Sequence, residues 1–387
     1  MARKKILMAA CNYWTSPFQV GSHQIARGFV DAGWDVAFIA SPISPLHFLG
    51  DRDDELEARY ASYKSGGEKD LAGHLWEYVP GALAVPTNKP LLRSGWMYRN
   101  WAKLTVPNVI KQVQKAGFGK VDLLYFDNIN ESFWLDELDY GKAILRVADN
   151  NAGFDVTTPA RNRLELELAR RVDLVIYSAE QLRDYVAAMH PKQMLHVPNG
   201  VNFAHFAKGS RELPLDYCDM PRPIAVYVGA MEEWFDFALV NRAAAALPDV
   251  SFVLIGSDRL ARERLDKSPN LHLLGSRPYS ELPKYLHNAD VGIIPFDVER
   301  YPALVNGIHP LKLYEYLACG LPVVAVDWAE LANINSPAVL CKDTEQFIAA
   351  IEQAVSSAPD RDALVGYASE ADWSKRVSAI IAAIGAT

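Results

Sequence analysis

The segment HPLKLYEYLACGLPVVAVDW, residues 309–328, predicts a short helix that leads directly into a buried strand. Proline just inside a helix and glycine just past its end are the usual terminal signals, so Pro310 and Gly320 are expected to bracket about nine helical residues. The apolar run Val323–Val326 is typical of a strand covered on both faces. A helix that starts beside the carboxyl edge of a parallel sheet offers free backbone N–H groups to an anion. The segment therefore predicts an α/β fold with an anion site at the helix start.

The same alternation of apolar runs and amphipathic segments continues along the chain. In the first half the expected strands are Ile6–Ala10, Val36–Ala40, Leu123–Phe126, Ala143–Val147, Leu174–Tyr177 and Leu195–Val197. In the second half they are Ile224–Val228, Phe252–Ile255, Leu271–Leu274, Gly292–Pro295, Val323–Val326 and Val339–Cys341. The pattern restarts near Ile224, after the proline-rich segment RELPLDYCDMPRP (residues 211–223). We therefore expect two Rossmann-like domains with parallel sheets, facing each other across a cleft lined by the carboxyl ends of the strands.

Length and composition limit the possible classes of protein. A chain of 387 residues is too long for a single core, which favours two domains. The net charge of −8 argues against nucleic-acid binding, because that requires a basic surface. The absence of a G-x-G-x-x-G or Walker A motif disfavours dinucleotide oxidoreductases and P-loop enzymes. The four scattered cysteines are interpreted as reduced, buried thiols of a cytosolic protein.

The N-terminal sequence MARKKILMAACNYW is interpreted as a first strand, because its apolar run is too short for a signal peptide. No segment approaches the roughly 18 uninterrupted apolar residues of a membrane span. We therefore expect a cytoplasmic protein, either soluble or peripheral on the inner face of the plasma membrane.

A basic and aromatic segment stands out in this acidic chain. No acidic residue occurs between residues 79 and 121, whereas residues 89–120 contain seven lysines and arginines together with Trp96, Tyr98 and Trp101. Such residues on amphipathic helices are typical of proteins that bind anionic membranes. The alternative is an ordinary domain face with some buried aromatic side chains.

Three glycines follow predicted strands of the second half: Gly229, Gly256 and Gly275. Glycine permits close approach of a ligand or unusual dihedral angles. Each one alone would indicate no more than a tight turn. Three at equivalent strand ends favour a ligand-binding rim.

The helix start near residues 308–312 would then bind the phosphates of a nucleotide sugar, with the backbone N–H groups and Lys312 supplying positive charge. Glu315 lies one turn further along the same face and could accept hydrogen bonds from ribose hydroxyls. The alternative is a surface Lys–Glu pair worth about 0.2–0.5 kcal/mol.

These motifs resemble those of a known family. The segments HPLKLYEYLACGLPVVA, PNGVNFAHF (residues 198–206), VYVGAMEEWFD and RRVDLVIYSAEQL look like the GT-B glycosyltransferases, which have two Rossmann-like domains and use nucleotide sugars. The resemblance covers nearly the whole chain and is to the bacterial branch that builds exopolysaccharides and cell-wall polymers, including the xanthan glucuronosyltransferase and teichuronic-acid types. In that family the lysine and glutamate matching Lys312 and Glu315 contact donor phosphate and ribose.

The resemblance implies a domain layout and a donor site. It implies an acceptor-binding domain over residues 1–205, a nucleotide-sugar domain over residues 206–370, and a terminal helix over residues 371–387 that packs back on the first domain. The loop with Pro278 and Tyr279 is similar to the one that holds the nucleotide base. The expected donor-binding residues are Gly229, Met231, Gly256, Pro278, Tyr279, Asn306, Ile308, His309, Lys312 and Glu315.

Two features of the sequence bear on the stereochemistry of the reaction: the residue at the first E-x₇-E position and the candidate bases in the first half. Retaining members often carry Glu at both ends of an E-x₇-E motif, but Gly307 occupies the first position here, which favours an inverting reaction. An inverting transfer needs a base for the acceptor hydroxyl. Asp149 directly follows a predicted strand and matches an aspartate of similar enzymes, so it is the expected base; Asp127, at the end of the preceding strand, is expected to orient its neighbour or the acceptor. Each could instead cap a helix or turn.

The first strand ends in CNYWTSPFQVGSHQIA, from which Asn12, Trp14 and Ser22 are expected to bind the acceptor, with Trp14 stacking on a sugar. His23, at a helix start, is interpreted as structural. No metal and no cofactor are expected: the D-x-D match at Asp51–Asp53 opens a charged helix, and Lys312 with the helix N–H groups would stabilise the leaving group.

The sequence and the resemblance together predict an inverting, metal-independent transfer of a hexosyl or glycuronosyl group from a nucleotide diphosphate sugar to a saccharide or lipid-linked saccharide. The resemblance implies that the donor is a UDP-sugar. The alternatives are a retaining transferase of the same fold, a sugar-nucleotide 2-epimerase, and an inactive binding or scaffold subunit.

Overall fold

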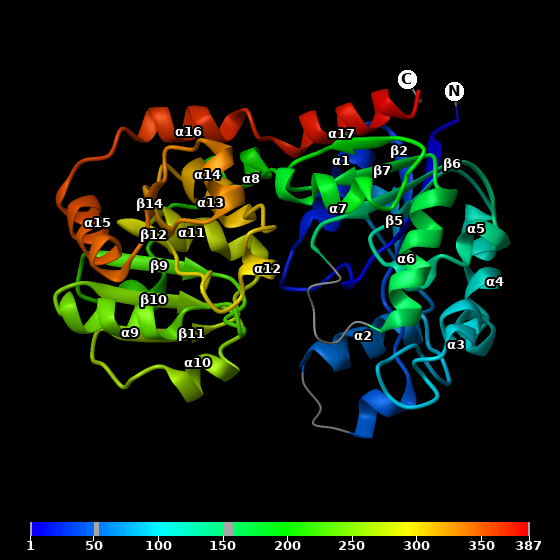
Figure 1. Cartoon of the computed structure of the whole chain (residues 1–387), viewed down its shortest axis with the longest axis horizontal. Coiled ribbons are helices and arrows are strands. Elements are labelled where there is room, and N and C mark those ends of the chain that lie inside the picture. Colours follow the sequence, from blue (N-terminus) through cyan, green and yellow to red (C-terminus); the bar gives the residue numbers. More distant parts are fainter. Residues whose placement is uncertain (1, 50–53, 151–157, 386–387) are drawn as a thin grey trace. The chain divides into compact units, whose positions relative to one another are not determined.

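The structure is a computed structural model that describes residues 2–49, 54–150 and 158–385. The chain divides into two compact units (Figure 1). The first comprises Met1–Ser16, Val20–Pro198 and Val377–Thr387, and the second Pro17–Gln19 and Asn199–Arg376. The division at Pro198 precedes the predicted boundary after residue 205, because Val201 already pairs with Ala371 of the second unit.

The first unit contains an eight-stranded sheet in the order β3-β4-β2-β1-β5-β6-β7-β8. Its strands are β1 (Lys4–Ala9), β2 (Trp34–Ile39), β3 (Glu68–Asp70), β4 (Leu75–Tyr78), β5 (Lys120–Phe126), β6 (Asp139–Val147), β7 (Leu174–Tyr177) and β8 (Met194–His196). Only the β3–β4 pair is antiparallel among these neighbours. The six strands expected from apolar runs are confirmed. Strands β3 and β4 were not predicted, because charged residues interrupt both.

The second unit contains a six-stranded parallel sheet in the order β11-β10-β9-β12-β13-β14. Its strands are β9 (Ile224–Val228), β10 (Ser251–Ile255), β11 (Leu271–Gly275), β12 (Val291–Ile294), β13 (Val323–Val326) and β14 (Val339–Cys341). All six were predicted. Their alternate side chains enter the cores on both faces, as in β10, which is buried throughout.

Helices connect the strands in both units. Those of the first unit are α1 (Gly21–Asp31), α2 (Asp54–Ser65), α3 (Gly95–Asn100), α4 (Val109–Val113), α5 (Trp134–Glu137), α6 (Pro159–Arg171) and α7 (Arg183–Ala187). The second unit has α8 (Phe203–Ala207), α9 (Phe237–Ala246), α10 (Arg259–Arg264), α11 (Leu282–His287), α12 (Pro302–Val305), α13 (Leu311–Ala318), α14 (Ala329–Ile334), α15 (Thr344–Ser356) and α16 (Arg361–Ser369). Helix α17 (Trp373–Ala383) starts in the second unit and continues into the first, where Val377 packs against Gly28 of α1.

Each sheet has a point at which the strand order reverses. In the first sheet this point lies between β1 and β5, and in the second between β9 and β12. Ligands of open α/β sheets bind at the carboxyl ends of the strands beside such points. In the first unit Asp127 follows β5 and Asp149 follows its neighbour β6; in the second unit Gly229 follows β9, and helix α13 lies between β12 and β13.

Candidate active site

Helix α13 is fixed to the strand-order reversal of the second sheet by one buried tyrosine. The hydroxyl of Tyr316 accepts a hydrogen bond from the N–H of Val228 at the end of β9, at 2.7 Å. Its ring covers Gly292 of β12, where a Cβ would come within 2.3 Å of the ring. Gly320, with φ of +68°, ends the helix as predicted. The start of α13 thus lies beside the expected ligand edge.

The ammonium group of Lys312 lies between two aromatic rings at this edge. Its Nζ is 5.0 Å from the ring centre of Tyr227 and 4.8 Å from that of Phe296. A Cβ on Gly229 would approach Lys312 Nζ to 3.2 Å, so the glycine leaves room for the lysine. Burial lowers the pKa of Lys312 to about 8, and nearby Glu315 partly opposes the shift.

Glu315 has a matching environment one turn along the helix. Burial raises the pKa of Glu315 to about 7, and Lys312 acts in the opposite direction. Among the described residues neither side chain has a hydrogen-bond or ion-pair partner. A cation and a carboxylate that are costly to bury and unpaired are suited to binding a polar ligand.

The three predicted glycines lie next to one another along the sheet edge. The N–H of Gly229 donates to the carbonyl of Ile255 at 2.8 Å, and that of Gly256 donates to Gly275 at 3.0 Å. A Cβ on Gly256 would come within 1.8 Å of the Gly229 carbonyl oxygen. The structure therefore brings together the glycines that the sequence suggested as a rim.

Two further predicted donor residues have distinct environments. The loop after Pro278 forms a turn at Tyr279, whose ring stacks on His205 at 4.4 Å and whose carbonyl oxygen lies 3.0 Å from His205 Nε2. Met231, in contrast, is buried in the core of the second unit. The sequence predicted Met231 as a donor-binding residue, but its side chain is covered by protein.

The predicted residues just before α13 are engaged with protein. The Asn306 Oδ1 accepts from the N–H of Ala329 at 3.0 Å, and the Ile308 carbonyl accepts from Trp328 Nε1 at 2.9 Å. His309 is buried and hydrogen-bonded through both ring nitrogens. The side chains of Asn306 and His309 therefore hold the loop rather than extend from it.

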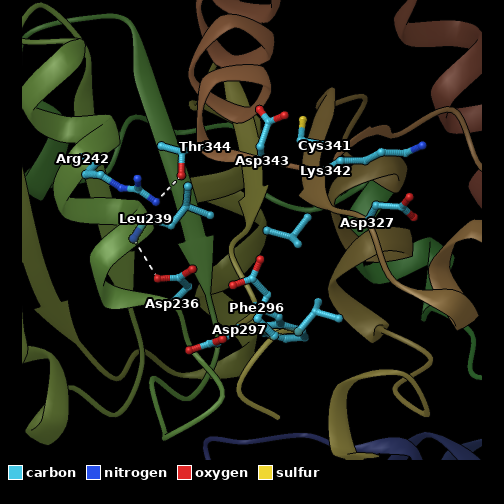
Figure 2. Close-up of a pocket in the computed structure, with 13 residues that line it drawn as sticks. Asp236, Leu239, Arg242, Phe296, Asp297, Asp327, Cys341, Lys342, Asp343 and Thr344 are labelled. Atoms are coloured by element: carbon cyan, nitrogen blue, oxygen red, sulfur yellow. Dashed lines mark hydrogen bonds between the residues drawn. The ribbon is translucent and has the colours of Figure 1, made fainter. Parts of the chain in front are cut away.

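Figure 2 shows a different pocket, of about 310 Å³, at the carboxyl ends of β12, β13 and β14. Arg242 and Lys342 are its two cations, and Arg242 bonds to Thr344. Five carboxylate residues line it: Asp236, Asp297, Glu299, Asp327 and Asp343. Repulsion from this excess of negative charge makes it a poor site for a diphosphate. The pocket borders Phe296, so it lies close to Lys312 without being the phosphate site.

A buried ion pair marks the corresponding edge of the first sheet. Arg146 of β6 and Asp127, just after β5, are 3.1 Å apart, and each side chain is 8% exposed. A Cβ on Gly21 would come within 2.7 Å of the Arg146 guanidinium, so the start of α1 is open to this side chain. Burial raises the pKa of Asp127, and Arg146 opposes the shift. Arg146 was not predicted from the sequence, although an arginine inside an apolar strand indicates a specific partner.

Asp149, the expected base, shares this environment. Burial raises the pKa of Asp149, the charge of Arg146 lowers it, and that of Asp127 raises it. Asp127 forms the ion pair with Arg146. Asp149 is affected by the charge of Arg146 without an ion pair to it. Of the two candidates, Asp149 is thus the one with a carboxylate outside the ion pair.

The other predicted acceptor residues differ in accessibility. Asn12 is half-buried, while Ser22 is buried and its hydroxyl interacts with Asp127. Trp14 is 3% exposed: its ring contacts His23 and Phe38, and its Nε1 donates to Asp70 at 2.6 Å. Stacking of Trp14 on a sugar is therefore not supported, because protein covers the ring. His23 is buried with a pKa lowered to about 4 by burial, consistent with a structural role.

Only one of the three aromatic side chains predicted to bind a membrane, that of Trp96, is exposed. Tyr98 and Trp101 are buried, whereas Trp96 is 61% and Leu91 88% exposed. Among the described residues no helix has the length and apolar character to cross a bilayer.

The described chain shows no cluster of three or more potential metal ligands, and the D-x-D match at Asp51–Asp53 lies outside the described residues. Cys319 and Cys341 are buried thiols as expected. The same expectation was wrong for Cys11 and Cys218, which are exposed because they lie in loops.

Two Rossmann-like sheets with candidate ligand residues at their carboxyl edges are the architecture of the GT-B glycosyltransferases, and the chain has this fold. Residues 222–357 match the family "Glycosyl transferases group 1". Residues 8–178 match "Glucuronosyltransferase GumK, N-terminal domain".

Individual relatives agree with this assignment. The Bacillus subtilis protein TuaH, described as a teichuronic acid biosynthesis glycosyltransferase, is 27% identical over 183 residues. That match covers 45% of this chain and 45% of TuaH, so less than half of the relative is compared. Sucrose-phosphate synthase from Thermosynechococcus elongatus has a TM-score of 0.64 at 18% identity, covering 99% of this chain and 96% of the other. Anabaena HepE in complex with UDP-glucose has a TM-score of 0.63 at 16% identity, covering 98% of both chains. These identities show a shared fold.

Proposed function

We propose that the protein transfers a sugar from a UDP-sugar to a saccharide or lipid-linked saccharide in polysaccharide biosynthesis. The observation that carries this proposal is the start of α13, where Lys312 points between two aromatic rings with Glu315 one turn away. Neither side chain has a hydrogen-bond or ion-pair partner among the described residues. The UDP-glucose complex of HepE and the polymer named for TuaH support the donor and the pathway class.

The donor end of the reaction follows from charge. When the bond between the anomeric carbon and the diphosphate breaks, negative charge grows on the departing phosphate oxygen. Lys312 and the first N–H groups of α13 stabilise that charge. This arrangement requires no metal ion, so we expect transfer to continue in the presence of EDTA.

The acceptor end requires a base. The acceptor oxygen attacks the anomeric carbon as its proton passes to the Asp149 carboxylate, and the diphosphate leaves from the opposite face. The sugar configuration inverts as a result. Analysis of the product anomer tests this step, since retention would exclude a single displacement with Asp149 as the base.

Binding of UDP tests the donor site most directly. Lys312→Ala removes one ion contact to a diphosphate, so we expect the Kd for UDP measured by calorimetry to rise about tenfold or more. Lys342→Ala is the matched control, because it removes a lysine from the acidic pocket of Figure 2. Equal affinities in wild type and Lys312→Ala would contradict the donor site.

A lipid-linked acceptor would bring the protein to a membrane surface. The first unit exposes Leu83, Leu91, Trp96 and Val106 within or beside the basic segment. Exposed apolar and basic side chains together suit an anionic bilayer interface. We expect flotation with phosphatidylserine vesicles that weakens in Trp96→Asp and at high salt; failure to float at moderate salt would remove the membrane part of the proposal.

A further inference from the structure

We propose that His309 is a positioning residue of the donor site, which ties the chain before α13 to α14 and so fixes Lys312 relative to the bound phosphates. The proposal deepens the function assigned above and rests on it. It also changes the role that the sequence suggested for His309, from direct donor contact to support of the groups that make the contact.

The imidazole of His309 bridges two buried side chains. Its Nδ1 lies 2.8 Å from Glu330 Oε1, and its Nε2 lies 2.8 Å from the hydroxyl of Tyr314. The Tyr314 ring stacks on the imidazole at 5.6 Å. An ionised carboxylate can only accept, so Nδ1–H donates to Glu330, and in a neutral imidazole Nε2 then accepts from Tyr314. Both ring nitrogens are used within the protein.

The neighbouring backbone is held by further hydrogen bonds. The carbonyl of His309 accepts from Asn199 Nδ2 at 2.7 Å, which gives a role to the PNGV motif. The carbonyl of Ile308 accepts from Trp328 Nε1 at 2.9 Å, and Asn306 Oδ1 accepts from Ala329 N at 3.0 Å. Hydrogen bonds to groups outside the segment therefore hold Asn306, Ile308 and His309 in place.

Helix α13 needs this support because of how it begins. It has eight residues, its N-cap position is Pro310, and no side chain caps its first N–H groups. Those N–H groups must stay available for phosphate, so the usual cap would compete with the ligand. The bridge through His309 holds the helix start without occupying it. Small displacements of a charged contact cost much binding energy, so such support affects phosphate affinity.

The test compares UDP with uridine, which lacks the phosphates. We expect His309→Ala to raise the Kd for UDP about tenfold and to leave that for uridine within about twofold, as for other residues that orient a ligand-binding group. Glu330→Ala should have the same effect, and the double variant should add little, because both act through one bridge. Glu330→Gln, whose amide oxygen still accepts, should stay within about threefold of wild type. His287→Ala, which removes another histidine of this unit bonded to a backbone carbonyl, is the matched control.

Several outcomes would overturn the proposal. Equal weakening of UDP and uridine in His309→Ala would indicate a general folding role. Loss of UDP binding in His309→Ala but not in Glu330→Ala would indicate that His309 contacts the donor itself. Where an alanine variant does not fold, the Kd values for UDP and for uridine are measured in His309→Gln and in Glu330→Gln instead. The ratio of the two Kd values is then compared between these variants. If Lys312→Ala also leaves UDP binding unchanged, the donor site is wrong; if only the His309 variants do so, the bridge alone is wrong.

Discussion

The carboxyl edges of the two sheets carry charged residues in opposite states. In the second unit Lys312 and Glu315 lie one helical turn apart, and among the described residues neither has a hydrogen-bond or ion-pair partner. In the first unit Arg146 and Asp127 are paired at 3.1 Å. Both sets adjoin the reversal of strand order, so topology places them equally well.

The difference indicates what each edge does. Buried charged groups with shifted pKa values and no ion-pair partner are typical of sites that bind a charged or polar ligand. The buried Arg146–Asp127 ion pair already balances its own charge, and the field of Arg146 acts on a third group, Asp149. We therefore infer that the second unit binds charge and the first adjusts a proton acceptor.

The largest effect is expected from Asp149→Asn. An amide cannot take the acceptor proton, so transfer should fall about 10²–10⁴-fold. The Kd for UDP should not change, because the donor contacts are in the other unit. Asp139→Asn, at the opposite end of β6 and exposed, should behave as wild type. Retained activity in Asp149→Asn would show that Asp149 is not the base. The role inferred for the first unit would then be wrong.

Breaking the ion pair should damage folding more than donor binding. Arg146→Met leaves the Asp127 charge buried without its partner, at a cost of about 3–5 kcal/mol in unfolding free energy measured with urea. Combining it with Asp127→Asn should recover much of that stability, because no buried charge remains.

Arg146→Lys retains the positive charge and is the variant in which to measure activity. Arg146 lowers the pKa of Asp149. The single ammonium of lysine does not extend as far as the guanidinium nitrogens, so its field at Asp149 should be weaker and the acid limb of the rate profile should move to higher pH. An unchanged profile would mean that the ion pair is only structural.

Most strands could be predicted from the sequence because a short run of apolar residues indicates a buried strand. Helical spacing places Lys312 and Glu315 on one face, and the three glycines at strand ends favoured a ligand site over a surface ion pair. Arg146 was missed because its partner Asp127 is on another strand, a pairing visible only in the folded chain. Trp14 and Met231 were assigned to ligands because no local pattern shows whether protein already covers a side chain.

A smaller effect concerns pH. Lys312 has a pKa of about 8 and Glu315 of about 7. A bound diphosphate favours charged lysine and ribose hydroxyls favour ionised glutamate, so UDP affinity should be highest between these values. It should fall as pH rises above 8, by up to about tenfold per unit, and again as pH falls below 7. Lys312→Arg should flatten the alkaline limb, because arginine stays charged. Identical profiles in calorimetry would show that Lys312 does not titrate at the site.

The smallest effect is expected from Gly229→Ala. Gly229 has φ of +151°, and Gly66 of the first unit has φ of +76° with no atom near its missing Cβ. Alanine at either position should cost about 1–3 kcal/mol in stability through backbone strain. Only at position 229 would the new Cβ lie 3.2 Å from the Lys312 ammonium, so only that variant should weaken UDP binding, by about threefold. If both variants bind UDP equally, Gly229 is not needed to leave space for Lys312. The proposed difference between the two sheet edges would then lose this support.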